Sequence, residues 1–103
     1  MAEYPNNYSW MMNRFGKVLE AHQHLGKELQ EAGPLDEKTS HLVRLAGAAA
    51  SRSEGGVHSH VKRAKSSGAS EDEIYHAIIL LASTIGFPST AAALSWARDI
   101  LED

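Results

Sequence analysis

The apolar residues of this chain recur at the three- and four-residue intervals of an α-helix, and no segment alternates apolar and polar residues as a strand does. Over residues 8–31, one face of such a helix carries most of the large apolar side chains. Gly16 and Gly26 weaken this helix, each by about 1 kcal/mol relative to alanine, so a bend or an early end is expected. Gly33 and Pro34 then end it.

The middle of the chain predicts two shorter helices. Asp36 can cap the first, whose apolar positions fall at i, i+3, i+4 and i+7. These positions are Leu42, Leu45, Ala46 and Ala49. The second spans residues 57–67, and its shared face consists of Val57, His60, Val61 and Ala64. His60 therefore points toward the core side, and Gly68 ends this helix.

A fourth helix begins at Ser70 and Glu73, which have the S-x-x-E spacing of a capping box. The residues that follow, as far as Ile85, are apolar on nearly every side of the helix. A small domain seldom buries a helix all round, so we expect a partner subunit to cover it. The sequence Gly-Phe-Pro at residues 86–88 breaks the chain, and a last helix is expected over residues 89–101.

Composition limits the class of protein. A chain of 103 residues with 43% hydrophobic content suits a single domain. The net charge of −3, with Lys and Arg spread along the chain, provides no basic surface for nucleic acid. No segment is long and apolar enough for a membrane span, and the first residues lack the features of a secretion signal. We therefore expect a cytoplasmic protein that binds neither nucleic acid nor membrane.

Several spaced positions carry a family resemblance. They are the Ala-rich helix after residues 35–39, His60, Ala64, Gly68, Ala69, Glu73, Ile74 and residues 86–88. This order resembles the carboxymuconolactone decarboxylase family within the alkylhydroperoxidase D-like superfamily. The resemblance implies an all-α fold of about five helices that forms homo-oligomers, trimers or hexamers. It predicts one domain over residues 1–103, with a family core at 35–101 and an N-terminal helix within 1–34 that matches no family motif.

The peroxidase branch of this family uses a C-x-x-C-x-x-x-H motif and a Glu in the preceding helix. Counting back from His60, the two cysteine positions are Ser53 and Gly56, and the Glu position is His41. The chain contains no cysteine. Serine cannot replace a thiolate in peroxide reduction, because its pKa is too high and it forms no disulfide. We therefore expect no peroxiredoxin activity from this chain, even where a family-level label names it.

The decarboxylase branch resembles this chain in having no cysteine pair. Its reaction removes carbon dioxide from a carboxylated muconolactone, which requires a group that binds the carboxylate and a group that transfers a proton. His60 could transfer the proton, because the pKa of histidine, about 6.5, lies near working pH. Arg44, Arg52 or Arg63 could bind the carboxylate.

The spacing of the six histidines argues against a metal site. Two pairs are spaced i and i+2, which places their side chains on different faces of a helix, and no histidine pair has the i, i+4 spacing of a helical zinc motif. We therefore predict no metal and no other cofactor, while a metal or proton-relay site stays open if His41, His60 and His76 converge in the fold. The predicted catalytic residues are His60, with His41 and His76 assisting, since His41 and His76 also stand where the family often has Glu.

Two functions remain open at this point. The first is a cysteine-independent lyase that decarboxylates a small carboxylated or lactone substrate. The second is a degenerate, non-catalytic oligomer that binds a small molecule or a partner, in which His60 is a structural histidine. Ser53 is expected to be a loop or cap residue rather than a nucleophile, because no adjacent base is visible.

Overall fold

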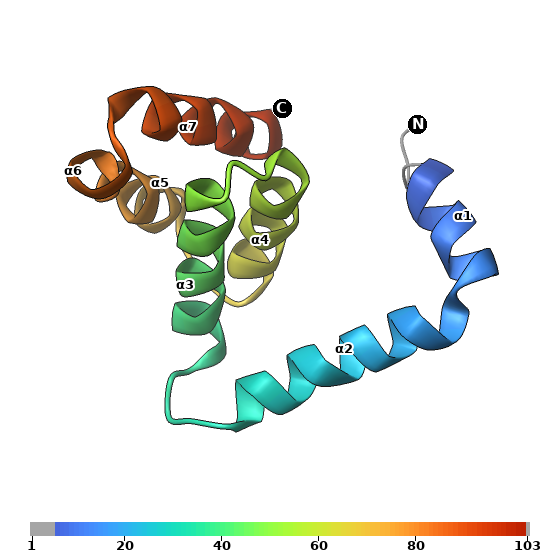
Figure 1. Ribbon diagram of the computed structural model, residues 1–103. Helices are drawn as coiled ribbons and strands as arrows, with labels where there is room; N and C mark the ends of the chain where they lie inside the picture. The colour runs from blue at the N-terminus through green and yellow to red at the C-terminus, as the bar shows by residue number, and fades with distance from the viewer. Residues whose placement is uncertain (1–5, 103) are drawn as a thin grey trace. The chain divides into compact units, whose positions relative to one another are not determined.

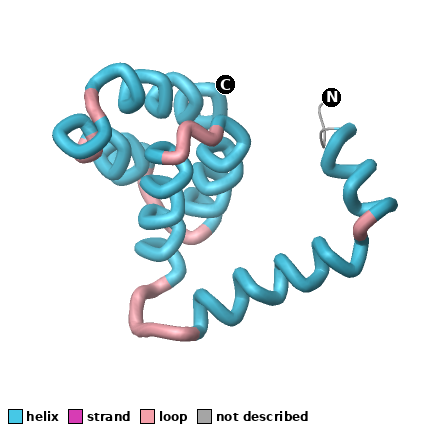
Figure 2. The backbone as a smooth tube through the Cα atoms, viewed as in Figure 1, coloured by secondary structure: helices cyan, strands magenta, loops and turns pink. Residues whose placement is uncertain are grey.

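The computed structural model describes residues 6–102, and within this range the chain folds into helices without strands (Figures 1 and 2). The helices are α1 (Asn6–Arg14), α2 (Gly16–Glu31), α3 (Glu37–Ala50), α4 (Glu54–Ser66), α5 (Glu71–Ile79), α6 (Ala82–Ile85) and α7 (Phe87–Leu101). The chain divides between Pro34 and Leu35 into two compact units. The all-α class predicted from the sequence is confirmed. Over residues 6–102, no helix combines the length and apolar character that a bilayer span requires.

The N-terminal unit contains α1 and α2, which the sequence predicted as one helix with weak points. The break falls at Phe15, whose backbone leaves the helical region at φ −128° and ψ 42°, directly before Gly16. Gly26, in contrast, lies inside α2 without interrupting it. None of the α2 residues is buried, and Val18 and Leu29 are 63% and 57% exposed. The apolar side chains of α2 therefore have no core of their own.

The core unit begins with α3 and α4, two helices that lie side by side and are joined by a short turn (Figure 1). Asp36 caps α3 as predicted, since its side chain accepts a hydrogen bond from the backbone N–H of Thr39 at 2.8 Å. Ser53 caps α4 in the same way through the N–H of Gly56 at 3.0 Å. Two short polar side chains thus fix where both helices start.

The second half of the core unit contains α5, α6 and α7. The predicted capping box is present, because Ser70 and Glu73 each accept the other's backbone N–H, at 2.9 and 3.0 Å. The predicted single helix to Ile85 is wrong, however. After Ile79 the chain tightens into i to i+3 hydrogen bonds around Leu81 and only a short α6 follows.

The start of α7 also differs from the sequence prediction. It begins at Phe87 rather than Ser89, because Pro88 lies in the first helical turn, where a missing N–H costs little. Gly86 precedes it with φ +93°, a backbone conformation that other residues rarely adopt. Thr90 is fully buried and donates its hydroxyl hydrogen to the Gly86 carbonyl at 2.9 Å, which holds the turn.

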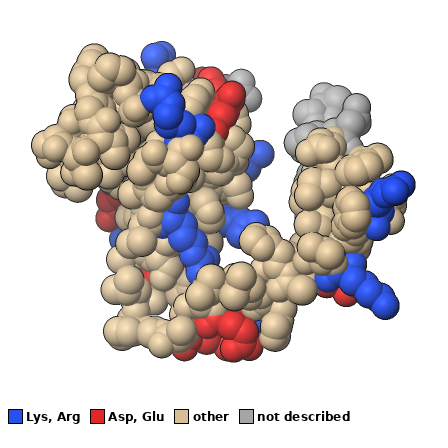
Figure 3. Space-filling view, in the orientation of Figure 1, with Lys and Arg blue, Asp and Glu red and all other residues tan. Residues whose placement is uncertain are grey.

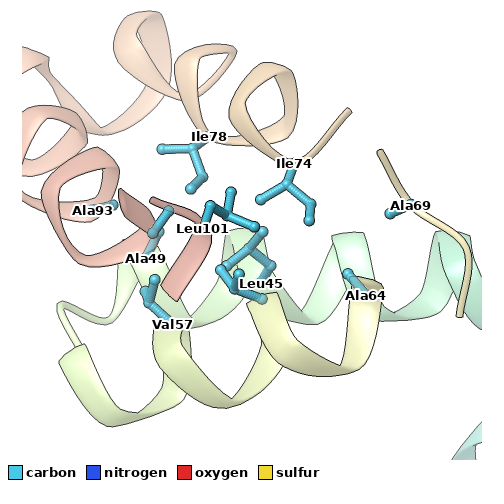
Figure 4. Close-up of a cluster of buried hydrophobic side chains, with 11 residues drawn as sticks. Leu45, Ala49, Val57, Ala64, Ala69, Ile74, Ile78, Ala93 and Leu101 are labelled. Carbon is cyan, nitrogen blue, oxygen red and sulfur yellow. The ribbon is translucent and has the colours of Figure 1, made fainter. Parts of the chain in front are cut away.

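The hydrophobic core lies between α3, α4, α5 and α7. Figure 4 shows Leu45, Ile74, Ile78 and Leu101 pointing toward one another. The remaining members of the cluster are Ala49, Val57, Val61, Ala64, Ala69, Ala93 and Ala97. More than half of these buried residues are no larger than valine, so the helices can approach one another closely.

Candidate functional site

His41 of α3 and His60 of α4 face one another across the pair of helices. Their ring centroids are 5.8 Å apart, with 32° between the ring planes. His41 is 8% exposed, and the Nδ1 atoms of both rings are buried without a hydrogen-bond partner in the described part of the chain. Buried polar atoms normally have a partner, so this pair stands out as a place where a ligand or water could bind.

The surroundings of the two rings disfavour their protonated forms. The pKa of His60 is lowered to about 4, first by burial and then by the positive charge of Arg63, by His41 and by Arg44. The pKa of His41 is also lowered, first by burial and then by Arg44 and Arg63, while Glu37 acts in the opposite direction. Both imidazoles are therefore neutral at pH 7 in the free protein.

A surface hollow of about 330 Å³ opens beside His41. Its lining residues come from the start of α3, the second half of α4 and the residue that follows α4, and they are Glu37, His41, Lys62, Arg63, Ser66 and Ser67. Figure 3 shows basic side chains over α3 and α4 on the face in view. The hollow thus combines two cations, the carboxylate of Glu37 and two hydroxyl groups with a neutral imidazole. The two cations outweigh the one carboxylate, so the lining keeps a net positive charge that can attract a small anion.

The three arginines considered from the sequence have different positions. Arg63 lines the hollow, and Arg44 lies near enough to both histidines to lower their pKa values. Arg52 lies in the turn between α3 and α4, where its guanidinium donates a hydrogen bond to the Ser89 hydroxyl. Arg52 is therefore engaged in holding α7 to this turn, and Arg63 is the one of the three that lines the hollow.

His76, the third predicted site residue, lies exposed in the last turn of α5. Within residues 6–102 it makes no hydrogen bond, ion pair or ring contact with His41 or His60, and these three residues do not form a group with metal-ligand spacing. The structure thus brings together two of the three predicted histidines.

The two cysteine positions of the peroxidase branch have structural roles here. Ser53 Oγ is the N-cap of α4, which agrees with the expectation that it is a cap residue. A Cβ atom at Gly56 would lie 2.8 Å from Ser53 Oγ and 2.9 Å from the Cβ of Ala48. Any side chain at position 56 would therefore push α3 and α4 apart at this point.

Two groups of polar residues were missed by sequence reasoning. The first is the set of Lys62, Ser66 and Ser67 in the hollow, which no motif marks. The second contains Glu54 and His58 of α4 and Asp99 of α7, whose ligand atoms all lie within 4.8 Å of one another. The i, i+4 spacing of Glu54 and His58 is visible in the sequence and could have indicated this group. Spacing between two histidines alone does not reveal it.

The comparison with protein families matches residues 16–99 to the carboxymuconolactone decarboxylase family. The match covers more than half of the chain, and the chain therefore belongs to this family. The match begins at the start of α2 and therefore includes residues 16–34, ahead of the family core expected at residues 35–101. Searches of curated proteins and of solved structures found no match.

The contact at Gly56 can be tested with a pair of adjacent glycines. Gly56→Ala should destabilise the protein by about 1–3 kcal/mol, because the added methyl group overlaps Ser53 and Ala48. Gly55→Ala should be neutral or stabilising by up to about 1 kcal/mol, because nothing lies within 4 Å of its Cβ position and alanine favours the helix. Urea unfolding of both variants measures the difference, and equal midpoints would show that α3 and α4 have room to spare at Gly56.

Proposed function

We propose that this protein is a cysteine-independent lyase that removes carbon dioxide from a small carboxylated lactone, the reaction class in the name of its family. The observation that carries the proposal is the His41–His60 pair, which is neutral at pH 7 and has two buried ring nitrogens without partners. Membership of the family supports the substrate class, and the cations at the hollow support the binding of a carboxylate.

Substrate binding starts at the hollow. Arg63 can hold a carboxylate with two parallel hydrogen bonds, and Lys62 adds a second positive charge on the same rim. Ser66 and Ser67 supply hydroxyl groups for the neutral oxygens of a lactone. Because His41 lines the same hollow, a substrate bound there contacts the histidine pair from the α3 side.

The bound anion changes the protonation of the pair. In the free protein, Arg44 and Arg63 help to keep both rings neutral. A substrate carboxylate offsets part of this positive field, so the pKa values of His41 and His60 rise when it binds. A larger fraction of the pair is therefore protonated in the complex than in the free protein.

The chemical step uses the proton that the protonated pair carries. When the bond between carbon and the carboxylate breaks, its electron pair passes into the conjugated lactone and carbon dioxide leaves. His41, which lines the hollow, delivers the proton to the resulting carbanion, and His60, whose ring centroid is 5.8 Å from that of His41, supplies the proton that restores it. One proton is consumed for each carbon dioxide released, so the charges balance, and no thiol or external oxidant is needed.

Turnover of a carboxylated muconolactone, followed as carbon dioxide release, tests this proposal. His60→Gln should lower kcat by about 100-fold or more, the usual cost of losing an acid–base group. Arg63→Met should mainly raise KM, because it removes substrate binding. His76→Gln is the control and should leave both constants unchanged, since His76 is exposed on α5.

The alternative, a non-catalytic binding protein, predicts a different pattern. It requires that the lactone or a related carboxylate binds to the wild type and more weakly to Arg63→Met, while no carbon dioxide is released by either protein. Equal turnover in wild type and His60→Gln, at equal helix content by circular dichroism, would contradict the catalytic role of His60.

We also propose that the chain is a homo-oligomer. In the core unit, Ile79, Leu80 and Phe87 are 45%, 61% and 69% exposed around the turn between α5 and α7. Large apolar residues grouped in this way are typical of subunit interfaces. In the N-terminal unit, the apolar side chains of α2 are likewise left without a core.

Light scattering after gel filtration tests the oligomer. The wild type should elute as an assembly of more than one chain, and Leu80→Asp should dissociate it because a buried charge at an interface is unfavourable. Ser83→Asp places the same charge on a nearby exposed residue of α6 and should leave the assembly intact. A monomeric wild type would contradict the proposal.

A further inference from the structure

A second group of polar residues lies where the first turns of α4 meet the end of α7. Glu54 and His58 are one helical turn apart on α4, so their side chains lie on the same face of this helix. His58 Nε2 is 3.0 Å from Asp99 Oδ2 of α7. His58 and His60 are two residues apart and point in different directions, which separates this group from the His41–His60 pair.

The three side chains have the spacing that a metal ion requires. Each offers one ligand atom, and these atoms all lie within 4.8 Å of one another. Metal bonds of about 2.0–2.2 Å place neighbouring ligand atoms about 3.0–3.6 Å apart, so the pair of His58 and Asp99 already has the right separation. A change of rotamer at Glu54, an exposed residue, would complete the set.

Glu54 and the hollow beside Asp99 are open to an ion, whereas His58 and Asp99 contact one another at 3.0 Å, a contact that a bound ion would replace. Glu54 has no hydrogen bond or ion pair within residues 6–102, and its backbone position in the first turn of α4 is fixed by the Ser53 cap. Asp99 also lines a polar hollow of about 430 Å³ together with Ser95, Arg98 and Glu102. In that hollow Arg98 is paired with Glu102 at 3.1 Å, so its charge is already compensated.

We propose that Glu54, His58 and Asp99 form a binding site for a divalent transition-metal ion such as Zn²⁺. Two carboxylates and a neutral imidazole carry charge −2 together, which matches a divalent cation. One imidazole nitrogen favours zinc and its neighbours over Mg²⁺ and Ca²⁺, which prefer oxygen ligands alone. Three protein ligands leave a coordination position free, and the hollow beside Asp99 gives solvent or a small molecule access to it.

The proposal differs from a simple ion pair between α4 and α7. An ion pair needs only His58 and Asp99. The metal site also needs Glu54, which makes no hydrogen bond or ion pair with either of these two residues. Binding of Zn²⁺ to the full chain, measured by calorimetry, should therefore weaken by about tenfold or more in His58→Ala, Asp99→Asn and Glu54→Gln alike. Glu54→Gln is the most informative variant because it disturbs no contact of the folded protein.

The chain provides a matched control on α2. His24 and Glu28 are also spaced i, i+4, and their nitrogen and oxygen atoms are 3.5 Å apart, but within residues 6–102 no third ligand accompanies them. His24→Ala should leave the zinc affinity unchanged. Co²⁺ added in place of Zn²⁺ should give visible absorption bands in wild type and His24→Ala that are lost in His58→Ala.

Two outcomes would overturn the metal site. One is Zn²⁺ binding in wild type that is no tighter than in His58→Ala, with both proteins folded by circular dichroism. The other is unchanged zinc affinity in Glu54→Gln, which would reduce the group to an ion pair. If His58→Ala proves unstable, Asp99→Asn and Glu54→Gln give the same comparison without removing the histidine ring.

Discussion

The close approach of α3 and α4 is the constraint on which the other features of the core unit depend. At Gly56 there is no space for a Cβ atom between Ser53 and Ala48, so the two helices meet there with almost nothing between them. Further along the same pair, the small and β-branched residues Ala49, Val57 and Val61 are fully buried. This approach brings His41 within 5.8 Å of His60 and removes both rings partly from water.

The same packing separates this chain from the peroxidase branch of its family. Position 56 would carry the second thiol in that branch, but here it is a glycine that allows the helices to touch. Ser53, at the first thiol position, instead caps α4. In this chain, the two positions of the redox pair are part of the junction between α3 and α4. The chemistry that we propose uses a different contact between the same helices, that of the neutral imidazoles of His41 and His60 with the cations near them.

Local signals in the sequence predicted the helix boundaries that depend on local physics. Asp36, the Ser70–Glu73 capping box and Gly68 all act as predicted, because their hydrogen bonds or backbone angles involve residues only a few positions away. The break after Ile79 was missed, since no glycine or proline marks it. The contact between His41 and His60 could be inferred only from their positions in the family pattern. The hollow beside His41 could not be predicted, because its six lining residues come from α3 and from α4 with its C-terminal cap, and the sequence does not specify how these helices pack.

The central claim is that helix packing and nearby cations keep the His41–His60 pair neutral in the free protein. The most direct test is a ¹⁵N NMR titration of the histidine rings in the full chain, with the signals assigned through His41→Gln and His60→Gln. His60 should titrate near pH 4, and His41 below its ordinary pKa. A His60 ring that takes up its proton at or above about pH 6.5, the ordinary pKa of histidine, would contradict the account.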